Sequence, residues 1–168
     1  MMTVEGMPKL NLGCGKDYQP LMFNVDSDKN VQADLYHDLN HYPYPFKDNS
    51  INFIRASHVI EHLDNQMKFM EECSRILQIG GVLEIECPIG GTWSSYHLNH
   101  KYNLTPYSFK IFEQEKWKWE FPFKFKIEGM WVQMPILNQR VNFPWRLIYV
   151  NCFVNNVFTK MKVRLIKI

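Results

Sequence analysis

A glycine turn after a short apolar run constrains the fold of this chain more than any other feature. Residues 9–13 form a strand-like run that turns at Gly13 and Gly15. Glycine tolerates a positive φ and has no Cβ, so a turn of this kind lets a ligand approach the backbone. A second strand-like run, residues 22–26, ends in Asp26. Ligands of open α/β sheets lie outside the carboxyl ends of the strands, so the turn and the carboxylate would line one crevice.

The same residues indicate which kind of ligand this crevice would bind. The carboxylate of Asp26 suits a ribose, because it can accept hydrogen bonds from two neighbouring hydroxyl groups. The dinucleotide fingerprint G-x-G-x-x-G is incomplete, since Tyr18 stands at the place of the third glycine. This departure disfavours a nicotinamide-dependent dehydrogenase.

The composition is that of a globular protein, with 168 residues of which 46% are apolar and 21% charged. The length predicts a single domain over residues 1–168. The cysteines, Cys14, Cys73, Cys87 and Cys152, have no C-x-x-C spacing, so we expect reduced thiols rather than a disulfide or zinc framework. The sequence shows no apolar leader and no run that could span a bilayer, which predicts a cytoplasmic protein.

The first half of the chain has an α/β order. Residues 51–56 form a strand pattern, and an amphipathic helix follows, capped by Asp64 and ended by Gly80-Gly81. The next strand, residues 82–87, is closed by a proline. Strands in this order imply a largely parallel sheet. Only about eight residues join the first two strands, so that connection should contain little or no helix.

The second half is aromatic and basic. Thr105 and Pro106 begin a helix, and residues 117–127 alternate aromatic side chains with polar ones, as expected for a strand with one buried face. A nucleic-acid platform is the alternative explanation, but the lysines all fall on the opposite side, so nucleic acid is an unexpected partner. We also expect a helix over 145–159 and a last strand over 163–168, antiparallel to the aromatic strand.

The charge is distributed unevenly along the chain. Residues 1–100 carry 13 acidic and 7 basic side chains, whereas residues 101–168 carry 4 acidic and 12 basic ones. A solvated basic face is the simplest explanation. The alternatives are an anionic small-molecule, sugar or lipid-linked acceptor, or a peripheral contact with a membrane surface.

Four parts of the sequence resemble class I S-adenosylmethionine-dependent methyltransferases of the type 11 group. These parts are Leu10-Asn11-Leu12-Gly13-Cys14-Gly15, Asp26, and the stretches from Pro45 to Leu63 and from Arg75 to Gly81. The resemblance implies a Rossmann-like, mostly parallel twisted sheet flanked by helices, with an antiparallel strand pair at the C-terminal end. Residues 1–90 would form the cofactor-binding half and residues 91–168 the acceptor side.

The resemblance also implies roles for single residues, with S-adenosyl-L-methionine as cofactor. The cofactor-binding residues would be Asn11, Gly13, Cys14, Gly15, Asp26, Asp38, Leu39, Ser57 and His58. Gly13 and Gly15 would face the methionine part, Asp26 the ribose, and Asp38 the adenine amine. Ser57 and His58 would border the place of methyl transfer.

An oxygen or nitrogen acceptor must lose a proton, and histidine is the natural base. The candidates are His58, at the end of a strand, and His97 and His100, in the long loop after residues 82–87. Two alternatives stay open. The first is an S-adenosylmethionine-binding protein without catalysis. The second is a zinc hydrolase, because His58-Val59-Ile60-Glu61-His62 matches H-x-x-E-H, although the favoured interpretation assigns no metal.

Overall fold

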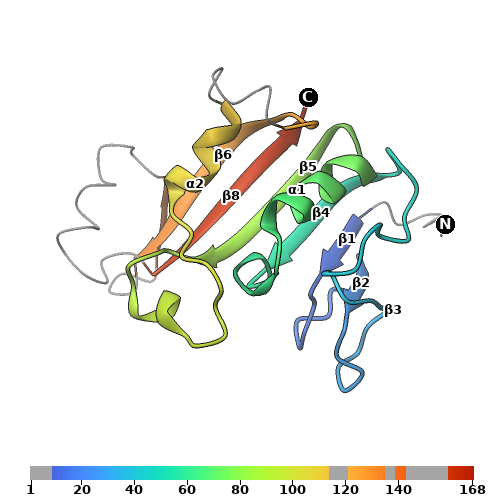
Figure 1. Ribbon diagram of the computed structural model, residues 1–168, viewed down its shortest axis with the longest axis horizontal. Coiled ribbons are helices and arrows are strands. Elements are labelled where there is room, and N and C mark those ends of the chain that lie inside the picture. Colours follow the sequence, from blue (N-terminus) through green and yellow to red (C-terminus); the bar gives the residue numbers. More distant parts are fainter. Residues whose placement is uncertain (1–8, 114–120, 135–138, 143–158) are drawn as a thin grey trace.

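The strands of the chain form one continuous sheet. The computed structural model describes residues 9–113, 121–134, 139–142 and 159–168. Its strands are β1 (Lys9–Leu12), β2 (Phe23–Asp26), β3 (Leu35–Tyr36), β4 (Ile51–Ser57), β5 (Leu77–Pro88), β6 (Phe125–Met134), β7 (Gln139–Asn142) and β8 (Lys160–Lys167). In these described ranges the sheet has eight strands, in the order β3-β2-β1-β4-β5-β8-β6-β7 (Figure 1).

The direction of the strands divides the sheet into two parts. Strands β3, β2, β1, β4 and β5 run parallel to their neighbours. Strand β8 pairs antiparallel with both β5 and β6, and β7 pairs antiparallel with β6. The predicted α/β class, with a mostly parallel sheet and antiparallel strands at its C-terminal end, is confirmed. The later strands extend the sheet that the first half begins.

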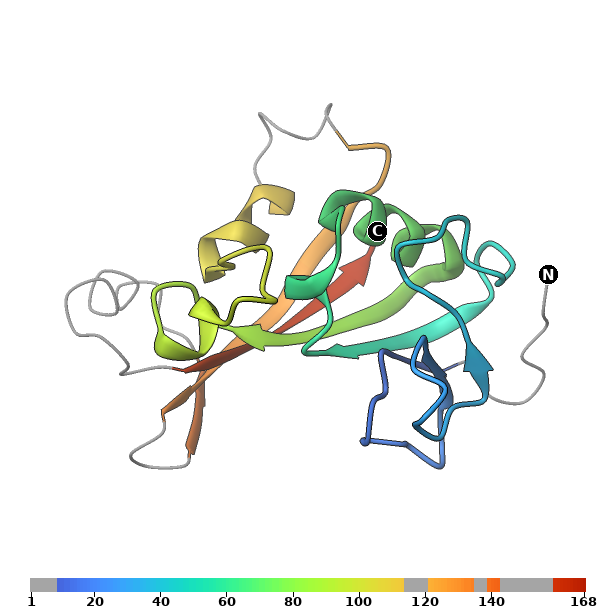
Figure 2. The same cartoon turned by 60° about the horizontal axis from the view of Figure 1, so that its bottom comes forward.

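The helices of the described ranges are η1 (Ile60–His62), α1 (Gln66–Ile76), η2 (Trp93–Tyr96), α2 (Pro106–Lys110) and η3 (Ile111–Glu113). Helices α1 and α2 lie over the same face of the sheet (Figure 2). The side chain of Asn65 caps α1 by accepting a hydrogen bond from the Lys68 backbone nitrogen at 2.9 Å, so the predicted Asp64 cap is wrong. None of these helices has the length and apolar character that crossing a bilayer requires.

The chain leaves α1 earlier than predicted. The helix ends at Ile76, and Leu77 already pairs with β4. The turn at Gly80, predicted to end the helix, therefore lies inside β5, where it has a φ of +79°. The register between β4 and β5 shifts in this region and is regular from Val82 onwards. The predicted strand over 82–87 is this regular part of β5.

No helix connects β1 and β2, as the short spacing predicts. The connecting loop is organised instead by the buried side chain of Asn24. Its Oδ1 accepts hydrogen bonds from the Gln19 backbone nitrogen at 2.9 Å and from Asn11 Nδ2 at 3.0 Å. Its Nδ2 donates to the carbonyl oxygens of Gln19 and Met22. Because this loop contains no helix, Asn24 supplies the hydrogen-bond partners that the polar groups of the loop need when they are buried.

The two faces of the sheet differ in chemistry. The face under the helices carries apolar core side chains, including Leu83 and Val163. On the other face the register places Arg55 of β4 opposite Glu84 of β5, and Lys162 of β8 donates to Glu84 at 2.6 Å. Parallel sheets are usually covered on both faces. Here a loop replaces the first crossover helix, and paired charges occupy the face that such helices would bury.

Most described basic residues near the C-terminus have partners inside the fold. Arg164 pairs with Glu128 at 3.1 Å, and the ammonium of Lys167 donates to the Asn49 side chain at 2.7 Å. These contacts show that part of the positive charge stabilises the sheet. Lys160, at the start of β8, forms no ion pair with any described residue.

The aromatic strand begins later than predicted. The first four residues of 117–127 lie outside the described ranges, and β6 begins only at Phe125. Pro122 explains the delay, because it has no N–H to donate to a strand ladder. The aromatic side chains before the strand pack together instead, with the rings of Phe112 and Phe123 5.9 Å apart.

Other predictions for the second half have mixed outcomes. The helix begun by Thr105 is confirmed as α2, with a capping box formed by Thr105 and Ser108. The last strand is confirmed as β8, antiparallel to β6. The helix predicted over 145–159 lies outside the described residues except for Thr159, which is not helical. The described cysteines are free and buried, as predicted: Cys14, Cys73 and Cys87.

Candidate functional site

A cavity of about 330 Å³ opens where the parallel strands end. The segments that follow β1, β2, β3 and β4 all contribute to it, as expected at the carboxyl edge of an α/β sheet. Its lining residues are Gly13, Gly15, Asp26, Ser27, His37, Asp38, Leu39, Asn40, His58, Val59, His62 and Leu63. A larger cavity of about 400 Å³ lies between α1 and the residues just before β6. It lacks the glycine turn, so we place the site in the first cavity.

The glycine turn shapes one wall of the cavity. Gly13 has a φ of +64°, and a Cβ placed on it would come within 2.4 Å of Val59 Cγ2. Gly15 has a φ of +51°, with no atom within 4 Å of such a Cβ. Packing against Val59 therefore requires glycine at position 13, whereas Gly15 leaves open space beside its backbone. Both have the left-handed backbone that glycine adopts most readily.

Asp26 lies opposite this turn at the end of β2. Its Oδ2 accepts a hydrogen bond from the Gly15 backbone nitrogen at 2.7 Å, and its Oδ1 accepts one from the Asp28 backbone nitrogen at 2.9 Å. A carboxylate has about four lone-pair positions, so these two bonds fix its orientation and leave capacity for two more donors. The arrangement suits a pair of neighbouring hydroxyl groups.

Asp38 and Leu39 follow β3 and form the next wall. Asp38 accepts a hydrogen bond from the Asn40 backbone nitrogen at 2.9 Å. The carbonyl of Leu39 accepts one from the Tyr44 hydroxyl at 2.8 Å, and the Tyr44 backbone nitrogen donates to Glu72 of α1 at 2.7 Å. Burial alone would raise the pKa of Glu72, but hydrogen bonds, chiefly from Arg75, outweigh it and hold that pKa below its usual value. This network connects the wall rigidly to α1.

Three of the predicted cofactor-binding residues do not line the cavity: Asn11, Cys14 and Ser57. The Asn11 side chain donates to the carbonyl of Asp17 and to Asn24, so its role is to hold the loop. Cys14 is buried, and its thiol donates to the Gln32 carbonyl at 3.5 Å. Burial, together with the nearby charge of Asp26, raises the pKa of this thiol.

His58 stands at the end of β4 with a φ of 56°, an uncommon conformation for a residue with a side chain. Its Nδ1 lies 3.2 Å from Oε1 of Glu61, which is 1% exposed. An ionised carboxylate only accepts hydrogen bonds, so Nδ1 carries the proton and Nε2 keeps a free lone pair. The Nε2 atom is buried and has no hydrogen-bond partner among the described residues. The pair resembles an oriented histidine base.

His97 and His100 are not among the residues that line the cavity. The rings of His100 and His62 are 4.7 Å apart, and those of His97 and His100 are 5.4 Å apart. Burial, with a smaller contribution from neighbouring His62, lowers the pKa of His100. The structure thus places His58 and His62 at the cavity.

Several residues of the cavity were not predicted from the sequence: Ser27, His37, Asn40, Val59, His62 and Leu63. His62 was predicted to lie on a helix, as a zinc ligand in the hydrolase alternative and otherwise as a hydrogen-bonding residue. In the structure His58 precedes the single 3-10 turn η1, so His58 and His62 do not share one helical face. The H-x-x-E-H interpretation therefore lacks the helix that it requires.

Comparisons with known proteins agree with this geometry. Residues 10–85 match the family model described as a methyltransferase domain. An S-adenosylmethionine-dependent methyltransferase from Archaeoglobus fulgidus is 16% identical, with a TM-score of 0.64 over 99% of this chain and 88% of that one. One from Mesorhizobium loti is 10% identical, with a TM-score of 0.63 over 99% and 93%. No curated protein matches the sequence.

A third structure adds a chemical comparison. Phosphoethanolamine N-methyltransferase 2 from Haemonchus contortus, in complex with S-adenosyl-L-methionine, is 14% identical, with a TM-score of 0.56 over 95% of this chain and 48% of that one. The fold is that of class I S-adenosylmethionine-dependent methyltransferases. These neighbours share the fold, and the match to the methyltransferase-domain model supports an enzyme of this class, with S-adenosylmethionine as its cofactor.

Proposed function

We propose that this protein transfers a methyl group from S-adenosylmethionine to an oxygen or nitrogen atom of a small anionic acceptor. The observation that carries the proposal is the cavity at the strand ends, where the glycine turn and Asp26 face the His58–Glu61 pair. The residues fit the cofactor, because Gly15 leaves open space beside its backbone and Asp26 keeps free acceptor capacity.

Different residues at the cavity would bind the cofactor and accept the proton. Gly13 and Gly15 would hold the methionine part, Asp26 the ribose and Asp38 the adenine amine. When bound, the cofactor supplies an activated methyl group, which leaves its sulfur as the bond to the acceptor forms. Holding the acceptor in line supplies much of the rate. His58 Nε2 would take the acceptor's proton, with Glu61 holding the ring in the required tautomer.

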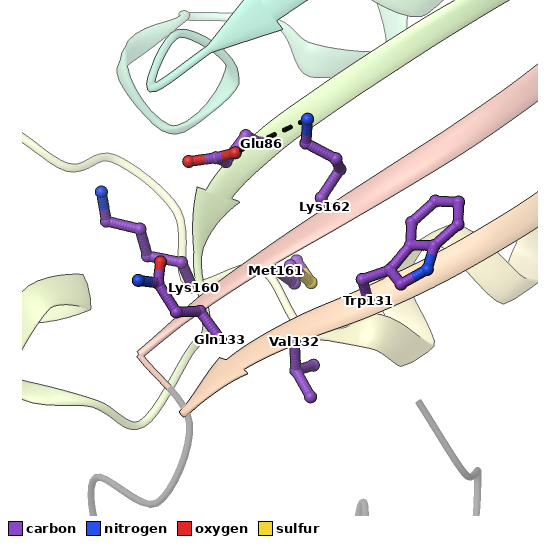
Figure 3. A pocket seen from close by; sticks show the side chains of 7 residues that line it. All are labelled: Glu86, Trp131, Val132, Gln133, Lys160, Met161 and Lys162. Atoms are coloured by element: carbon purple, nitrogen blue, oxygen red, sulfur yellow. Dashed lines mark ion pairs between the residues drawn. The ribbon is translucent and has the colours of Figure 1, made fainter. Parts of the chain in front are cut away.

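Two observations support an anionic acceptor. The first is Lys160, which forms no ion pair with any described residue. In the strand register it lies opposite Pro88 at the end of β5, so it stands at the carboxyl edge of the sheet. Figure 3 shows its side chain beside that of Gln133, while Lys162 turns toward Glu86. The second is the Haemonchus contortus neighbour, whose name specifies the phosphate-bearing acceptor phosphoethanolamine. A sugar phosphate, a nucleotide sugar or a lipid-linked glycan phosphate has the same anionic character.

An acceptor screen tests this proposal. The protein would be incubated with S-adenosylmethionine and phosphate-bearing or neutral acceptors, and S-adenosylhomocysteine release would be measured by mass spectrometry. We expect turnover with phosphate-bearing acceptors only. Lys160→Ala should raise the KM for the acceptor about tenfold through the loss of one charge contact. The matched control is Lys126→Ala. Lys126 is an exposed lysine near the start of β6, whereas Lys160 lies beside the end of β6.

The outcomes of the screen separate the open alternatives. Turnover that prefers neutral acceptors, or that does not respond to Lys160→Ala, would contradict the anionic class while leaving methyl transfer intact. Binding of S-adenosylhomocysteine without turnover of any acceptor would favour a cofactor-binding protein without catalysis.

A further inference from the structure

Three side chains with metal-binding atoms meet beside the cavity. One donor atom from each of Glu61, His62 and His100 lies within 4.8 Å of the other two. Glu61 is 1% exposed, and it belongs to η1 with His62, whereas His100 comes from the loop after β5. Of the three, only His62 lines the cofactor cavity. The cluster therefore adjoins the place assigned to methyl transfer.

Hydrogen bonds leave one atom of each side chain free to bind a cation. His62 Nδ1 lies 3.1 Å from the Asn99 carbonyl, which only accepts, so Nδ1 carries the proton and Nε2 keeps its lone pair. Glu61 uses Oε1 for His58, and its Oε2 is buried with no hydrogen-bond partner among the described residues. His100 Nδ1 is buried and without a partner in the same described set.

Unpartnered buried polar atoms are costly, at about 1–3 kcal/mol each and more for a charged group. Two such atoms, on residues that cluster with His62, form an arrangement that a cation would stabilise. From this geometry we propose that Glu61 Oε2, His62 Nε2 and His100 Nδ1 bind one divalent transition-metal ion, with zinc as the best-matched probe. One carboxylate and two imidazoles suit such ions better than magnesium or calcium.

The two segments that supply the ligands are already fixed to one another. The Lys101 backbone nitrogen donates to the Glu61 carbonyl at 2.8 Å, next to the His62 contact with Asn99. The Tyr102 hydroxyl also donates to the carbonyl of Asp64 at 3.0 Å. Hydrogen bonds from ligating histidines to carbonyl oxygens are typical of the outer shell of metal sites.

The ligand atoms need only a small adjustment to reach bonding distance. Tetrahedral zinc with bonds of about 2.0–2.2 Å places neighbouring ligands about 3.4 Å apart. One ligand atom of each residue already lies within 4.8 Å of the other two, so side-chain movements of about 1 Å would close the site. Three protein ligands leave the fourth position open, which is the pattern of catalytic sites.

The open position gives the metal a role in the proposed reaction, and this role, unlike the site itself, rests on the proposed function. A metal beside His62 would bind an acceptor hydroxyl or amine, lower its pKa and orient it toward the cofactor cavity. His58, bonded to the other oxygen of Glu61, would then receive the proton. This set differs from H-x-x-E-H, because His100 replaces His58 as a ligand.

Zinc titration of the protein treated with chelator tests the site without any cofactor. Calorimetry of the wild type should show one zinc ion per chain, and zinc should raise the thermal midpoint. Glu61→Gln and His100→Ala should each weaken zinc binding by about 100-fold or more. His41→Ala is the control, since His41 is an exposed histidine outside the cluster, and it should bind zinc like the wild type.

Two further measurements keep the result interpretable. Circular dichroism verifies that each variant is folded, and His100→Ala, in a loop, guards against a Glu61→Gln protein that does not fold. Substoichiometric wild-type binding, or equal affinity in wild type and folded His100→Ala, would overturn the proposal and indicate that ordered water satisfies these atoms. S-adenosylhomocysteine is titrated separately. Its failure to bind would contradict the methyltransferase assignment, whereas one zinc per chain would still support the metal site.

Discussion

Replacing Gly13 with alanine should weaken the binding of S-adenosylhomocysteine by about tenfold or more, which corresponds to about 1.4 kcal/mol. Two physical effects act at this position: backbone strain, which lowers the free energy of unfolding, and a clash that alters the cavity wall. The φ of +64° costs a residue with a Cβ about 1–2 kcal/mol. The new methyl group would also lie 2.4 Å from Val59 Cγ2, and valine is too stiff to yield without moving into the cavity that it lines. Calorimetric titration measures the change.

Gly80→Ala is the matched control for this substitution. Gly80 has a φ of +79°, no atom lies within 4 Å of a Cβ placed on it, and it is far from the cavity in the sheet, at the start of β5. It should therefore lower the free energy of unfolding without changing the affinity for the ligand. A folded Gly13→Ala protein with wild-type affinity would show that the glycine turn does not contact the cofactor.

His58→Ala should reduce turnover by about 10²-fold or more, the usual effect of losing a general base. The expectation rests on Nε2, which is buried, has no hydrogen-bond partner among the described residues and belongs to a ring oriented by Glu61. Turnover would be measured as S-adenosylhomocysteine release, with the acceptor found in the screen. The loss should appear in kcat rather than in the KM for the acceptor.

His97→Ala provides the comparison for His58. His97 is also a histidine near the site, but it is not among the residues that line the cavity. We expect it to keep most of the wild-type turnover. If His97→Ala loses activity and His58→Ala does not, the loop after β5 supplies the base and the His58–Glu61 pair only shapes the cavity.

Much of the sheet could be predicted because local patterns determine it. β1, β2 and β4 are short apolar runs bounded by glycine, aspartate or turn residues, and burial in a parallel sheet leaves little ambiguity in such runs. The absence of a helix between β1 and β2 followed from chain length alone. The two-residue strand β3 was missed, because Leu35–Tyr36 is too short to show any periodicity.

Errors arose where two local signals competed. Asp64 and Asn65 are both good caps, and only the hydrogen bond to Lys68 identifies Asn65. The alternation of residues 117–127 predicted a strand throughout, yet the clustering of aromatic rings around Phe112 and the missing N–H of Pro122 delay β6 to Phe125.

The candidate site was predictable only in part. Gly13, Gly15 and Asp26 end strands with distinctive residue types, so the sequence marks them directly. His62 and His100 are 38 positions apart, and no local pattern indicates that their rings lie 4.7 Å apart. Their contact depends on the hydrogen bond from the Lys101 backbone nitrogen to the Glu61 carbonyl, which only the folded chain forms.

Binding of S-adenosylhomocysteine to the wild type and to Asp26→Ala tests the central claim most directly. Calorimetry should show one ligand per wild-type chain, and Asp26→Ala should weaken binding by about 1–3 kcal/mol through lost hydrogen bonds to a charged group. Asp28→Ala, which keeps the backbone N–H bonded to Asp26, should bind like the wild type. No binding to the wild type at millimolar ligand, or equal affinity in wild type and Asp26→Ala, would contradict a cofactor site at this strand end.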